Sequence, residues 1–384
     1  MRRTRLSKFT LHLLIAALLC AAVILCIARF RAPAAPESAP SPTTAPHEPS
    51  SVPMPTPTPT PVPTPARTPE PSYAPKNWTL SFAGDCTIGT LHEWRGIGTQ
   101  NNMLFRMGGD YAYPFANVKD IFEADDFTLV NFEGTLTESS APICKDYRFS
   151  APPEYAAVLT AGSVEAVSLA NNHSVDYGAV GAADTRAALD GAGILWGDGE
   201  TPIITELEDG LKLGIVPFNA VEIDLDVGDA DGYMARIAPM YVACRESGCG
   251  IVIAFVHWGW EYRYSPEPWM VELAHALAGL GFNMVVGSHA HILQPMEVYE
   301  GVPIFYSLGN FCFGGHSNPK DKDCVIVRQE IVSPAEGEYA LGNTELIPCR
   351  ISTTDSVNDF RPTPYEPESA EYFRVLEKLG VGSA

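Results

Sequence analysis

Short apolar runs with the period of β-strands recur through residues 77–384, and segments with helical periodicity separate them. The first run, "NWTLSFAGD", alternates apolar and polar side chains, whereas "GIVIAFVHWG" is apolar almost throughout. Strands that alternate with helices along a chain imply a layered α/β architecture. The sequence therefore predicts one large α/β domain, long enough to bury a sizeable core.

The boundaries of these elements follow from periodicity and from turn residues. A proline pair opens the helix expected at 152–162, and glycine ends the one expected at 176–194. We predict strands over residues 77–85, 128–135, 164–172, 211–219, 250–259, 282–291, 302–311, 324–332 and 339–351. We predict helices over residues 115–127, 152–162, 176–194 and 267–281, and one that ends near Cys249.

Polar side chains collect where the predicted strands end. They are Asp85, Glu133, Asn172, His173, His257, His289 and His291. In an open α/β sheet the carboxyl ends of the strands share one edge, which is where ligands bind. Carboxylate, amide and imidazole groups without a thiolate suit Mn²⁺, Fe or Zn²⁺. The pattern therefore predicts a site for one or two divalent metal ions at this edge.

The first 76 residues differ in composition from the domain. Residues 1–31 place four basic residues before an apolar run from Leu11 to Ala28, which would span roughly 27 Å as a helix. We expect a transmembrane anchor whose basic flank stays in the cytoplasm, with a cleaved signal peptide as the alternative. Residues 32–76 are rich in proline and predict a disordered, extended linker.

The charge of the domain argues against one class of partner, and its cysteines argue against one class of metal site. The first 76 residues hold 8 of the 25 Lys and Arg residues and 3 of the 46 Asp and Glu residues, so the domain has a net charge near −26. That balance argues against nucleic acid as a partner. Seven of the nine cysteines lie in the domain, and the absence of a CxxC pair among them argues against a structural zinc site. A disulfide between Cys244 and Cys249 and free buried thiols both remain open.

Five segments carry a resemblance to a known family. "FAGDCTIG", "VNFEGTLT", "SLANNHSVDYG", "HWGWEY" and "GSHAHILQPMEVYEGVPIFYSLGNFCF" resemble the successive motifs of the CapA family of capsule synthesis proteins, the poly-γ-glutamate accessory proteins. The resemblance covers about residues 80–313. The CapA family is similar in fold to calcineurin-like metallophosphoesterases, which implies a layered sandwich with helices flanking central β-sheets.

The resemblance also implies roles for individual residues. His173 matches the catalytic histidine that contacts the leaving group, and Asn171 is expected to fix the turn before it. Within the same motifs we expect Glu261, Arg263 and Asn310 to contact substrate. The metal ligands that the resemblance implies are Asp85, Glu133, Asn172, His257, His289 and His291, with Glu133 bridging.

One position departs from the phosphoesterase pattern. Thr87 stands where those enzymes carry a histidine two residues after the first aspartate. CapA proteins are similar to this chain in that respect. His92 is the nearest imidazole, but its spacing gives no support for a replacement ligand, so the presence of two metal ions stays open.

The resemblance implies a function at the cell envelope. We expect a single-pass membrane protein, with its C-terminal domain outside the cell, that acts in the synthesis, export or attachment of an anionic polymer such as poly-γ-glutamate. Metal-assisted hydrolysis or transfer is the expected chemistry. The alternatives are a non-catalytic, metal-stabilised scaffold for a membrane-bound polymer synthase, and a phosphoesterase that acts on cell-wall phosphates.

Overall fold

The computed structural model describes residues 73–94, 96–221 and 230–382. The anchor or signal peptide predicted over residues 1–31 lies outside these ranges, as does nearly all of the linker predicted over residues 32–76. Within the described ranges no helix combines the length and apolar character that crossing a membrane would need.

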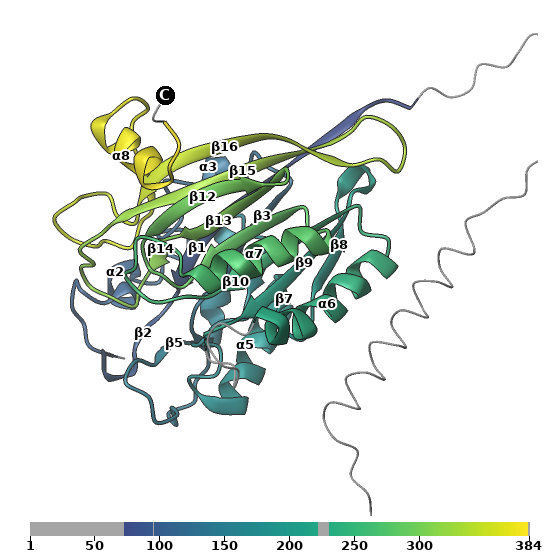
Figure 1. Cartoon of the computed structure of the whole chain (residues 1–384). Coiled ribbons are helices and arrows are strands. Elements are labelled where there is room, and N and C mark those ends of the chain that lie inside the picture. The colour runs from purple at the N-terminus through teal and green to yellow at the C-terminus, as the bar shows by residue number, and fades with distance from the viewer. Residues whose placement is uncertain (1–72, 95, 222–229, 383–384) are drawn as a thin grey trace, which may run out of the picture. The chain divides into compact units, whose positions relative to one another are not determined.

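Two mixed β-sheets form the centre of the domain (Figure 1). In the described residues the first sheet has the strand order β17-β16-β15-β1-β3-β6-β7, and β14 also pairs with β1. The second sheet has the order β12-β13-β11-β10-β9-β8, and a small third sheet has the order β2-β5-β4. Strands β1, β3, β6 and β7 run parallel to one another, as do β9, β10, β11 and β13. Each large sheet therefore gathers several carboxyl ends at one edge.

The strands of the first sheet are β1 (Lys76–Thr87), β3 (Phe127–Phe132), β6 (Ala166–Ser168), β7 (Leu195–Gly197), β14 (Asn310–Phe313), β15 (Asp323–Ser333), β16 (Ala340–Arg350) and β17 (Thr363–Pro364). Those of the second sheet are β8 (Ile203–Glu206), β9 (Lys212–Asn219), β10 (Ile251–His257), β11 (Met284–Ser288), β12 (Leu293–Tyr299) and β13 (Val302–Leu308). The third sheet comprises β2 (Thr90–Leu91), β4 (Thr135–Leu136) and β5 (Phe149–Ala151).

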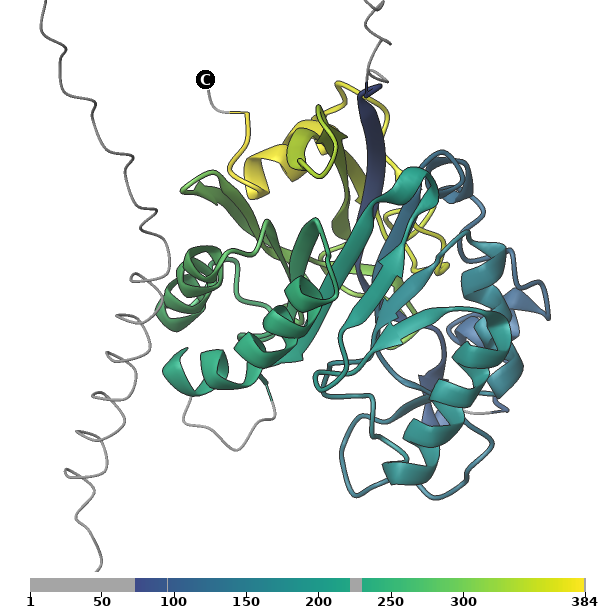
Figure 2. The ribbon, with the colours of Figure 1, turned by 90° about the vertical axis from the view of Figure 1, so that its right-hand side faces the viewer.

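Helices cover the outer faces of both large sheets (Figure 2). The α-helices are α2 (Met103–Met107), α3 (Lys119–Phe122), α4 (Ala157–Ala161), α5 (Gly178–Ala192), α6 (Ala230–Glu246), α7 (Pro268–Leu280) and α8 (Ala370–Lys378). Short 3₁₀ turns are η1 (His92–Trp94), η2 (Pro153–Ala156) and η3 (Glu208–Gly210). Helices α6 and α7 pack on the second sheet, and α4 and α5 pack on the first.

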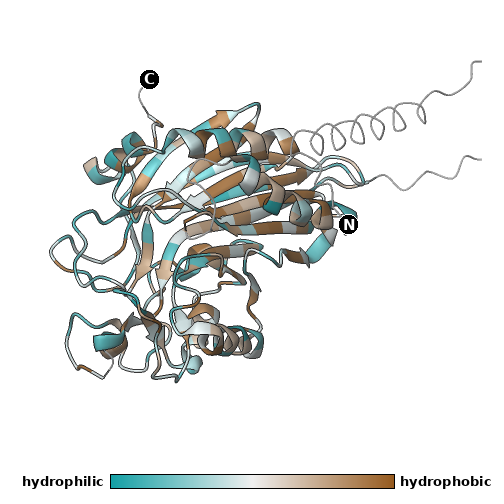
Figure 3. Ribbon diagram, turned by 60° about the horizontal axis from the view of Figure 1, so that its bottom comes forward, coloured by the Kyte–Doolittle hydropathy of each residue, from teal (hydrophilic) through white to brown (hydrophobic). Residues whose placement is uncertain are grey.

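The apolar runs of the sequence are explained by burial of the central strands on both faces (Figure 3). In β10, Ile253 and Phe255 belong to the core between the two sheets, whereas Val252 and Ala254 pack under α6 and α7. Successive side chains of a strand point to opposite faces, so a strand that is covered on both faces must be apolar at every position. The domain is thus an α/β fold with two mixed sheets flanked by helices, as predicted.

Most predicted elements of the domain are present, and two are much shorter than expected. The strand predicted over residues 164–172 is reduced to the three residues of β6. The helix predicted over residues 115–127 is reduced to the single turn of α3. Phe115 and Phe122 are buried at a spacing that resembles a helical period, but Phe115 lies in the series of turns before α3 and only Phe122 lies in the helix. Beyond α3, the side chain of Asp126 accepts a hydrogen bond from the Thr79 backbone N–H at 2.7 Å, which ties the segment to β1. This competing contact accompanies the change from helix to β3.

Candidate metal centre

A close approach between two backbones places Asp85 at the carboxyl edge of the first sheet. A Cβ atom on Gly84 would lie 1.9 Å from the carbonyl oxygen of Gly309, so only glycine fits there. The Asp85 backbone N–H donates to that same oxygen at 3.0 Å. The register of β1 against β3 shifts between Ala83 and Asp85, which turns the Asp85 side chain toward the edge.

The histidines enter the site from the second sheet. His257 is the last residue of β10, and His289 and His291 follow β11 directly. His289 and His291 have φ angles of 91° and 57°, which are uncommon for residues other than glycine. Backbone strain of this kind persists where the surrounding structure holds it, and it clusters at functional sites. The "SHAH" segment is therefore shaped for the placement of its two imidazoles.

Two groups of ligand atoms meet at Glu133. One comprises Glu133, His257 and His289, and the other comprises Asp85, Glu133 and His291. Within each group the ligand atoms lie within 4.8 Å of one another, and all five side chains are buried. The metal-binding pattern predicted from the strand ends is thus assembled in three dimensions, with Glu133 shared by both groups.

Glu133 carries the clearest sign that a cation belongs here. Both of its carboxylate oxygens are fully buried, and neither accepts a hydrogen bond from the described residues. Burial raises the pKa of the Glu133 carboxyl, and the nearby Asp85 and Glu261 carboxylates raise it further against the opposing charge of His291. An ionised carboxylate without partners is costly in a protein interior. A divalent ion between the two groups would satisfy both oxygens, so the residues present fit a metal.

The protonation states of the imidazoles agree with that assignment. Burial lowers the pKa of His257 and of His289, and neighbouring imidazoles lower both further, so these rings stay neutral. Neutral imidazole is the form that binds metal. Burial also acts to lower the pKa of His291, but Glu133 and Asp85 outweigh it and hold that pKa above its usual value. In the absence of an ion, His291 is therefore a proton-bearing partner for the two carboxylates.

Asn172 lies beside the imidazole pair. Its side-chain oxygen is 2.9 Å from Nε2 of His257, and Nδ1 of His289 is 3.0 Å from that same nitrogen. The Oγ atom of Ser288 lies 2.9 Å from Nδ1 of His257 on the other side of the ring. The predicted amide ligand thus lies next to the first ligand group.

A network of asparagine side chains supports the ligands. Asn131 donates to Oδ1 of Asp85 at 2.8 Å and accepts from Asn171 at 3.0 Å. The Asn171 side chain also accepts from the backbone N–H of His173 at 3.0 Å, so it fixes the turn as predicted. Asn131 was missed in the sequence, although it precedes Glu133 by two residues in "VNFEG". The only available signal was an amide inside an apolar strand, which had to find a partner.

His173 is held by a carboxylate that the sequence motifs did not single out. Nδ1 of His173 lies 2.8 Å from Oδ2 of Asp176, and its Nε2 lies 3.8 Å from Oε1 of Glu133. Asp176 is fully buried and also accepts from the Phe149 backbone N–H at 2.8 Å. Burial lowers the pKa of His173, against the opposing effect of Asp176. This arrangement orients a neutral imidazole whose Nε2 faces the ligand cluster.

The residues predicted to contact substrate fall in two places. Glu261 and Arg263 line a cavity of about 670 Å³ that Asn172 and His289 also line. Asn310 is buried and instead contacts His291, with its side-chain oxygen 2.9 Å from Nδ1 of that ring.

Thr87 and His92 lie outside the two ligand groups. Thr87 is buried, and its hydroxyl has no hydrogen-bond partner among the described residues. Nδ1 of His92 lies 2.8 Å from the hydroxyl of Tyr177. His92 therefore does not replace the histidine that phosphoesterases carry at position 87.

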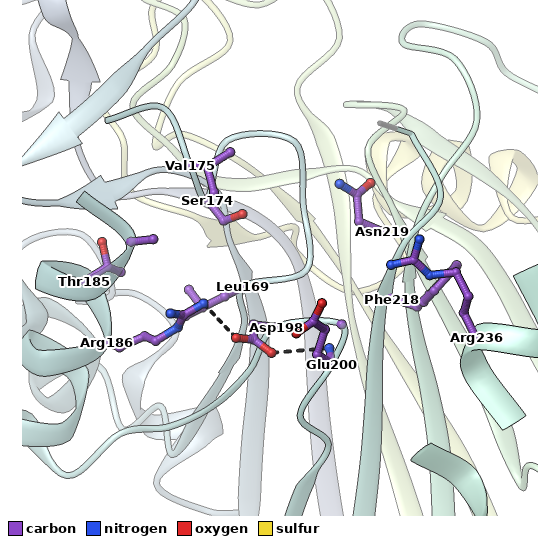
Figure 4. A pocket seen from close by; sticks show the side chains of 12 residues that line it. Leu169, Ser174, Val175, Thr185, Arg186, Asp198, Glu200, Phe218, Asn219 and Arg236 are labelled. Atoms are coloured by element: carbon purple, nitrogen blue, oxygen red, sulfur yellow. Dashed lines mark hydrogen bonds and ion pairs between the residues drawn. The ribbon is translucent and has the colours of Figure 1, made fainter. Parts of the chain in front are cut away.

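A second cavity of about 310 Å³ lies beside the loop that carries His173 (Figure 4). Ser174, Arg186 and Asp198 line one part of it, and Asn219 and Arg236 line another. Arg186 and Asp198 form an ion pair at 2.8 Å. None of the metal-ligand candidates lines this cavity, so it is separate from the cluster around Glu133.

The cysteines of the described residues are free thiols. Cys244 and Cys249 lie close enough for hydrogen bonding but are not joined. The other buried cysteines lie in the core, and burial raises the pKa of Cys86, Cys312, Cys324 and Cys349. Such thiols are unreactive packing groups.

Comparison with solved structures finds distant likenesses. The NAD nucleotidase of Haemophilus influenzae gives a TM-score of 0.37 at 12% identity, over 80% of this chain and 56% of that one. The sulfate thiohydrolase SoxB of Thermus thermophilus gives a TM-score of 0.40 at 12% identity, over 78% of this chain and 59% of that one.

Comparison of sequences is more specific. The chain is 26% identical over 330 residues to the PGA biosynthesis protein CapA of Bacillus subtilis, which covers 80% of this chain and 79% of that protein. It is 28% identical over 268 residues to the capsule biosynthesis protein CapA of Bacillus anthracis, over 64% of this chain and 62% of that one. The family model described as bacterial capsule synthesis protein PGA_cap matches residues 79–315, which include every ligand of both groups. The chain therefore belongs to the PGA_cap family of bacterial capsule synthesis proteins.

Proposed function

We propose that this protein acts in the synthesis, export or attachment of poly-γ-glutamate or a similar anionic capsule polymer, as a metal-dependent hydrolase or transferase. Membership of the PGA_cap family supports the process. One observation supports the chemistry: the buried carboxylate of Glu133 accepts no hydrogen bond from the described residues, is shared by two ligand groups and lies 3.8 Å from Nε2 of His173. The sequence motifs also follow the order found in metallophosphoesterases, which supports the same metal-dependent chemistry.

The metal would be held by Asp85, Glu133, Asn172, His257, His289 and His291. Mn²⁺, Fe or Zn²⁺ bound there would supply Lewis-acid polarisation of a phosphoryl or carbonyl oxygen and make water more acidic. The chain's own contribution to proton transfer comes from His173. Asp176 holds Nδ1 of this ring, which leaves Nε2 to accept or donate a proton toward the ligand cluster. Asp176 is therefore a positioning residue for His173.

The N-terminal sequence completes the proposal. Residues 1–31 would anchor the protein in the cell membrane, and the Pro-rich segment would carry the domain away from the outer surface of that membrane. Subunits of a membrane-bound polymer synthase are the partners that this location favours.

A non-catalytic scaffold is the second candidate, and the identity of Thr87 favours it. Thr87 replaces a metal-ligating histidine of the phosphoesterase pattern, and its hydroxyl is buried without a partner in the described residues. A scaffold would need the metal only for folding. The buried His173–Asp176 pair favours an enzyme, because a scaffold has no use for an oriented imidazole.

The experiment that separates the two candidates compares His173→Gln with Asn172→Ala in cells at matched protein level. The enzyme predicts that His173→Gln keeps its metal and lowers polymer formation by about 10² to 10⁴-fold, the usual contribution of a general acid or base. Asn172→Ala should lower metal content. Normal polymer yield from His173→Gln at full metal occupancy would leave the scaffold as the function.

A further inference from the structure

Two cysteine side chains meet where helix α6 ends. The helix closes with a Schellman motif, in which the Gly248 N–H donates to the carbonyl oxygen of Arg245 at 3.0 Å. In the same motif the Cys249 N–H donates to the carbonyl oxygen of Cys244 at 3.1 Å. Gly248 supplies the left-handed turn that this motif requires, with a φ of 85°. Side chains at the positions of Cys244 and Cys249 commonly contact each other in a Schellman motif, so the local backbone brings the two thiols together.

The strand beneath this helix end leaves room for both sulfur atoms. A Cβ atom on Gly214 of β9 would lie 2.9 Å from Sγ of Cys244 and 3.3 Å from Sγ of Cys249. Both sulfurs therefore lie over the same glycine, and the two thiols are within hydrogen-bonding range of each other. The pair is thus positioned by the backbones of two elements that pack together, the end of α6 and β9.

The two thiols lie just below the surface and differ in their electrostatic surroundings. Both side chains are buried, but residues 245–248 between them are exposed. Burial raises the pKa of Cys244 to about 12. Burial also raises the pKa of Cys249, but the positive charges of Lys212 and Arg245 oppose that rise. Cys249 is therefore the thiol that ionises more readily and reacts first with an oxidant.

A second close pair of cysteines lacks these features. Cys324 on β15 lies directly opposite Cys349 on β16, and both are fully buried in the core. The thiol of Cys349 donates to the carbonyl oxygen of Ile347 in its own strand at 3.3 Å. This pair lies within a sheet and has no exposed turn beside it, so it serves as an internal comparison for the pair at the end of α6.

We propose that Cys244 and Cys249 form an intramolecular disulfide bond that fixes the end of α6 to the start of β10. The oxidant is a disulfide carried by another molecule, such as an extracytoplasmic thiol oxidase. The Cys249 thiolate attacks one sulfur of that disulfide, forms a mixed disulfide and releases a first thiolate. The Cys244 thiol then loses its proton and attacks the Cys249 sulfur, which releases a second thiolate. The pair loses two electrons and two protons, and the oxidant is reduced to two thiols.

The bond suits the location proposed for the domain, because disulfides form and persist outside the cytoplasm. It does not depend on the metal chemistry, since it lies at the start of β10 and the ligand His257 is at the end of that strand. Closing the short loop between the two cysteines restricts the unfolded chain. The bond should therefore favour the folded state by about ten- to fifty-fold.

Peptide mapping of the full-length protein tests the proposal. Iodoacetamide is added to the cells before lysis, so that free thiols are blocked and existing disulfides are kept. Trypsin cuts after Arg245, so a disulfide would hold residues 237–245 and 246–263 together until reductant is added. We expect mass spectrometry to find these two peptides linked. Unlinked peptides that carry alkylated Cys244 and alkylated Cys249 would overturn the proposal.

Reoxidation of the purified protein in detergent tests the choice of partner. After reduction, oxidised glutathione should restore the link between Cys244 and Cys249 and leave Cys324 and Cys349 as thiols. Cys144 is exposed and should take up glutathione, which shows that the reagent is active. A link between Cys324 and Cys349 in place of the expected one, or a lasting glutathione adduct on Cys249, would show that the pair at the end of α6 is wrongly assigned.

Thermal melts separate the effect of the bond from the effect of packing. Reductant should lower the melting temperature of the parent protein and leave that of Cys249→Ala unchanged, because the variant has no bond to lose. Cys349→Ala is the matched control: it also removes a buried thiol, but it should remain as sensitive to reductant as the parent. If reductant affects Cys249→Ala as strongly as the parent, the two cysteines do not form a stabilising bond.

Discussion

Glu133 is a fully buried carboxyl group whose two oxygens accept no hydrogen bond from the described residues. We predict that Glu133→Gln removes metal binding while the metal-free protein keeps or gains thermal stability. The neutral amide has nearly the same shape, and it cannot take on the negative charge whose burial raises the pKa of the Glu133 carboxyl. Metal analysis and thermal melts with and without added Mn²⁺ or Zn²⁺ measure both effects.

The control for this substitution is Glu345→Gln. Glu345 is exposed and pairs with Arg328 at 2.9 Å, so its loss should change stability by at most about 1 kcal/mol and leave the metal content intact. A Glu133→Gln protein with a full complement of metal, or one that melts well below the metal-free parent, would contradict the assigned role of Glu133.

Protons and a metal ion compete for the same side chains, and this competition gives a second prediction. The pKa of Glu133 is raised mainly by burial, and that of His291 is raised by Glu133 and Asp85, so the metal-free site holds protons that a metal must displace. Lowering the pH favours those protons and weakens the metal site, whereas raising it has the opposite effect. We expect affinity for Zn²⁺ or Mn²⁺ to rise by roughly tenfold or more per pH unit between about pH 5.5 and pH 8.

Calorimetric titration in buffers with different enthalpies of ionisation measures this release directly. The apparent binding enthalpy should vary with the buffer, with a slope equal to the number of protons released. A slope of zero at neutral pH would mean that the ligands are already deprotonated without metal.

The residues that converge at the centre were predictable from their positions at strand ends, because parallel strands bring their carboxyl ends to one edge. Asp176 and Asn131 were not found. Asp176 acts through a loop that folds back on His173, and Asn131 acts across β1 and β3. Neither contact can be predicted from the spacing of these residues along the chain. Ligands on strand ends follow from the topology, whereas the groups that orient them depend on how the loops close.

At the scale of elements, strands buried on both faces were recognised because a short run that is apolar at nearly every position is typical of a covered strand. The helix expected at 115–127 is reduced to α3, because the buried Phe115 and Phe122 imitate a helical period although Phe115 lies in a series of turns. Short edge elements such as β7, β8 and β12 were also missed. Their side chains are only partly buried, so their sequences lack a strong period.

The contact between β1 and the segment before β14 gives a prediction at this scale. Gly84→Ala should destabilise the domain by about 1 to 3 kcal/mol, because its Cβ would lie 1.9 Å from the carbonyl oxygen of Gly309. Separating these backbones would also displace Asp85, so metal content should fall together with the melting temperature. Chemical denaturation and metal analysis of the same preparation test the coupling.

Gly191→Ala provides the matched control. Gly191 lies within α5, and a Cβ there meets no atom within 4 Å. Alanine at this position should stabilise the helix by about 0.5 to 1 kcal/mol and leave the metal site unchanged. A Gly84→Ala variant as stable as this control would show that the close approach of the two backbones is not needed.

At the scale of the whole molecule, the sequence divides the chain into a basic, apolar start, a Pro-rich segment and an acidic domain. Among the described residues the first strand is β1, which pairs with β15 from Lys76 onward. An extended Pro-rich segment exposes its backbone to proteases, whereas a strand within a sheet does not. The expected cleavage region therefore lies between residues 32 and 75.

We predict that protease added to intact, wall-stripped cells releases a soluble fragment that begins in this region and retains the metal. The reason for this expectation is the group of basic residues before Leu11, from which the positive-inside rule predicts an N-terminus inside the cell and a domain outside. Immunoblotting and N-terminal sequencing of the supernatant identify the fragment, and an intact cytoplasmic protein shows that the cells remain sealed. Release of the domain without protease would indicate a cleaved signal peptide in place of an anchor. Complete protection until the cells are permeabilised would place the domain in the cytoplasm and remove the extracellular polymer from its reach.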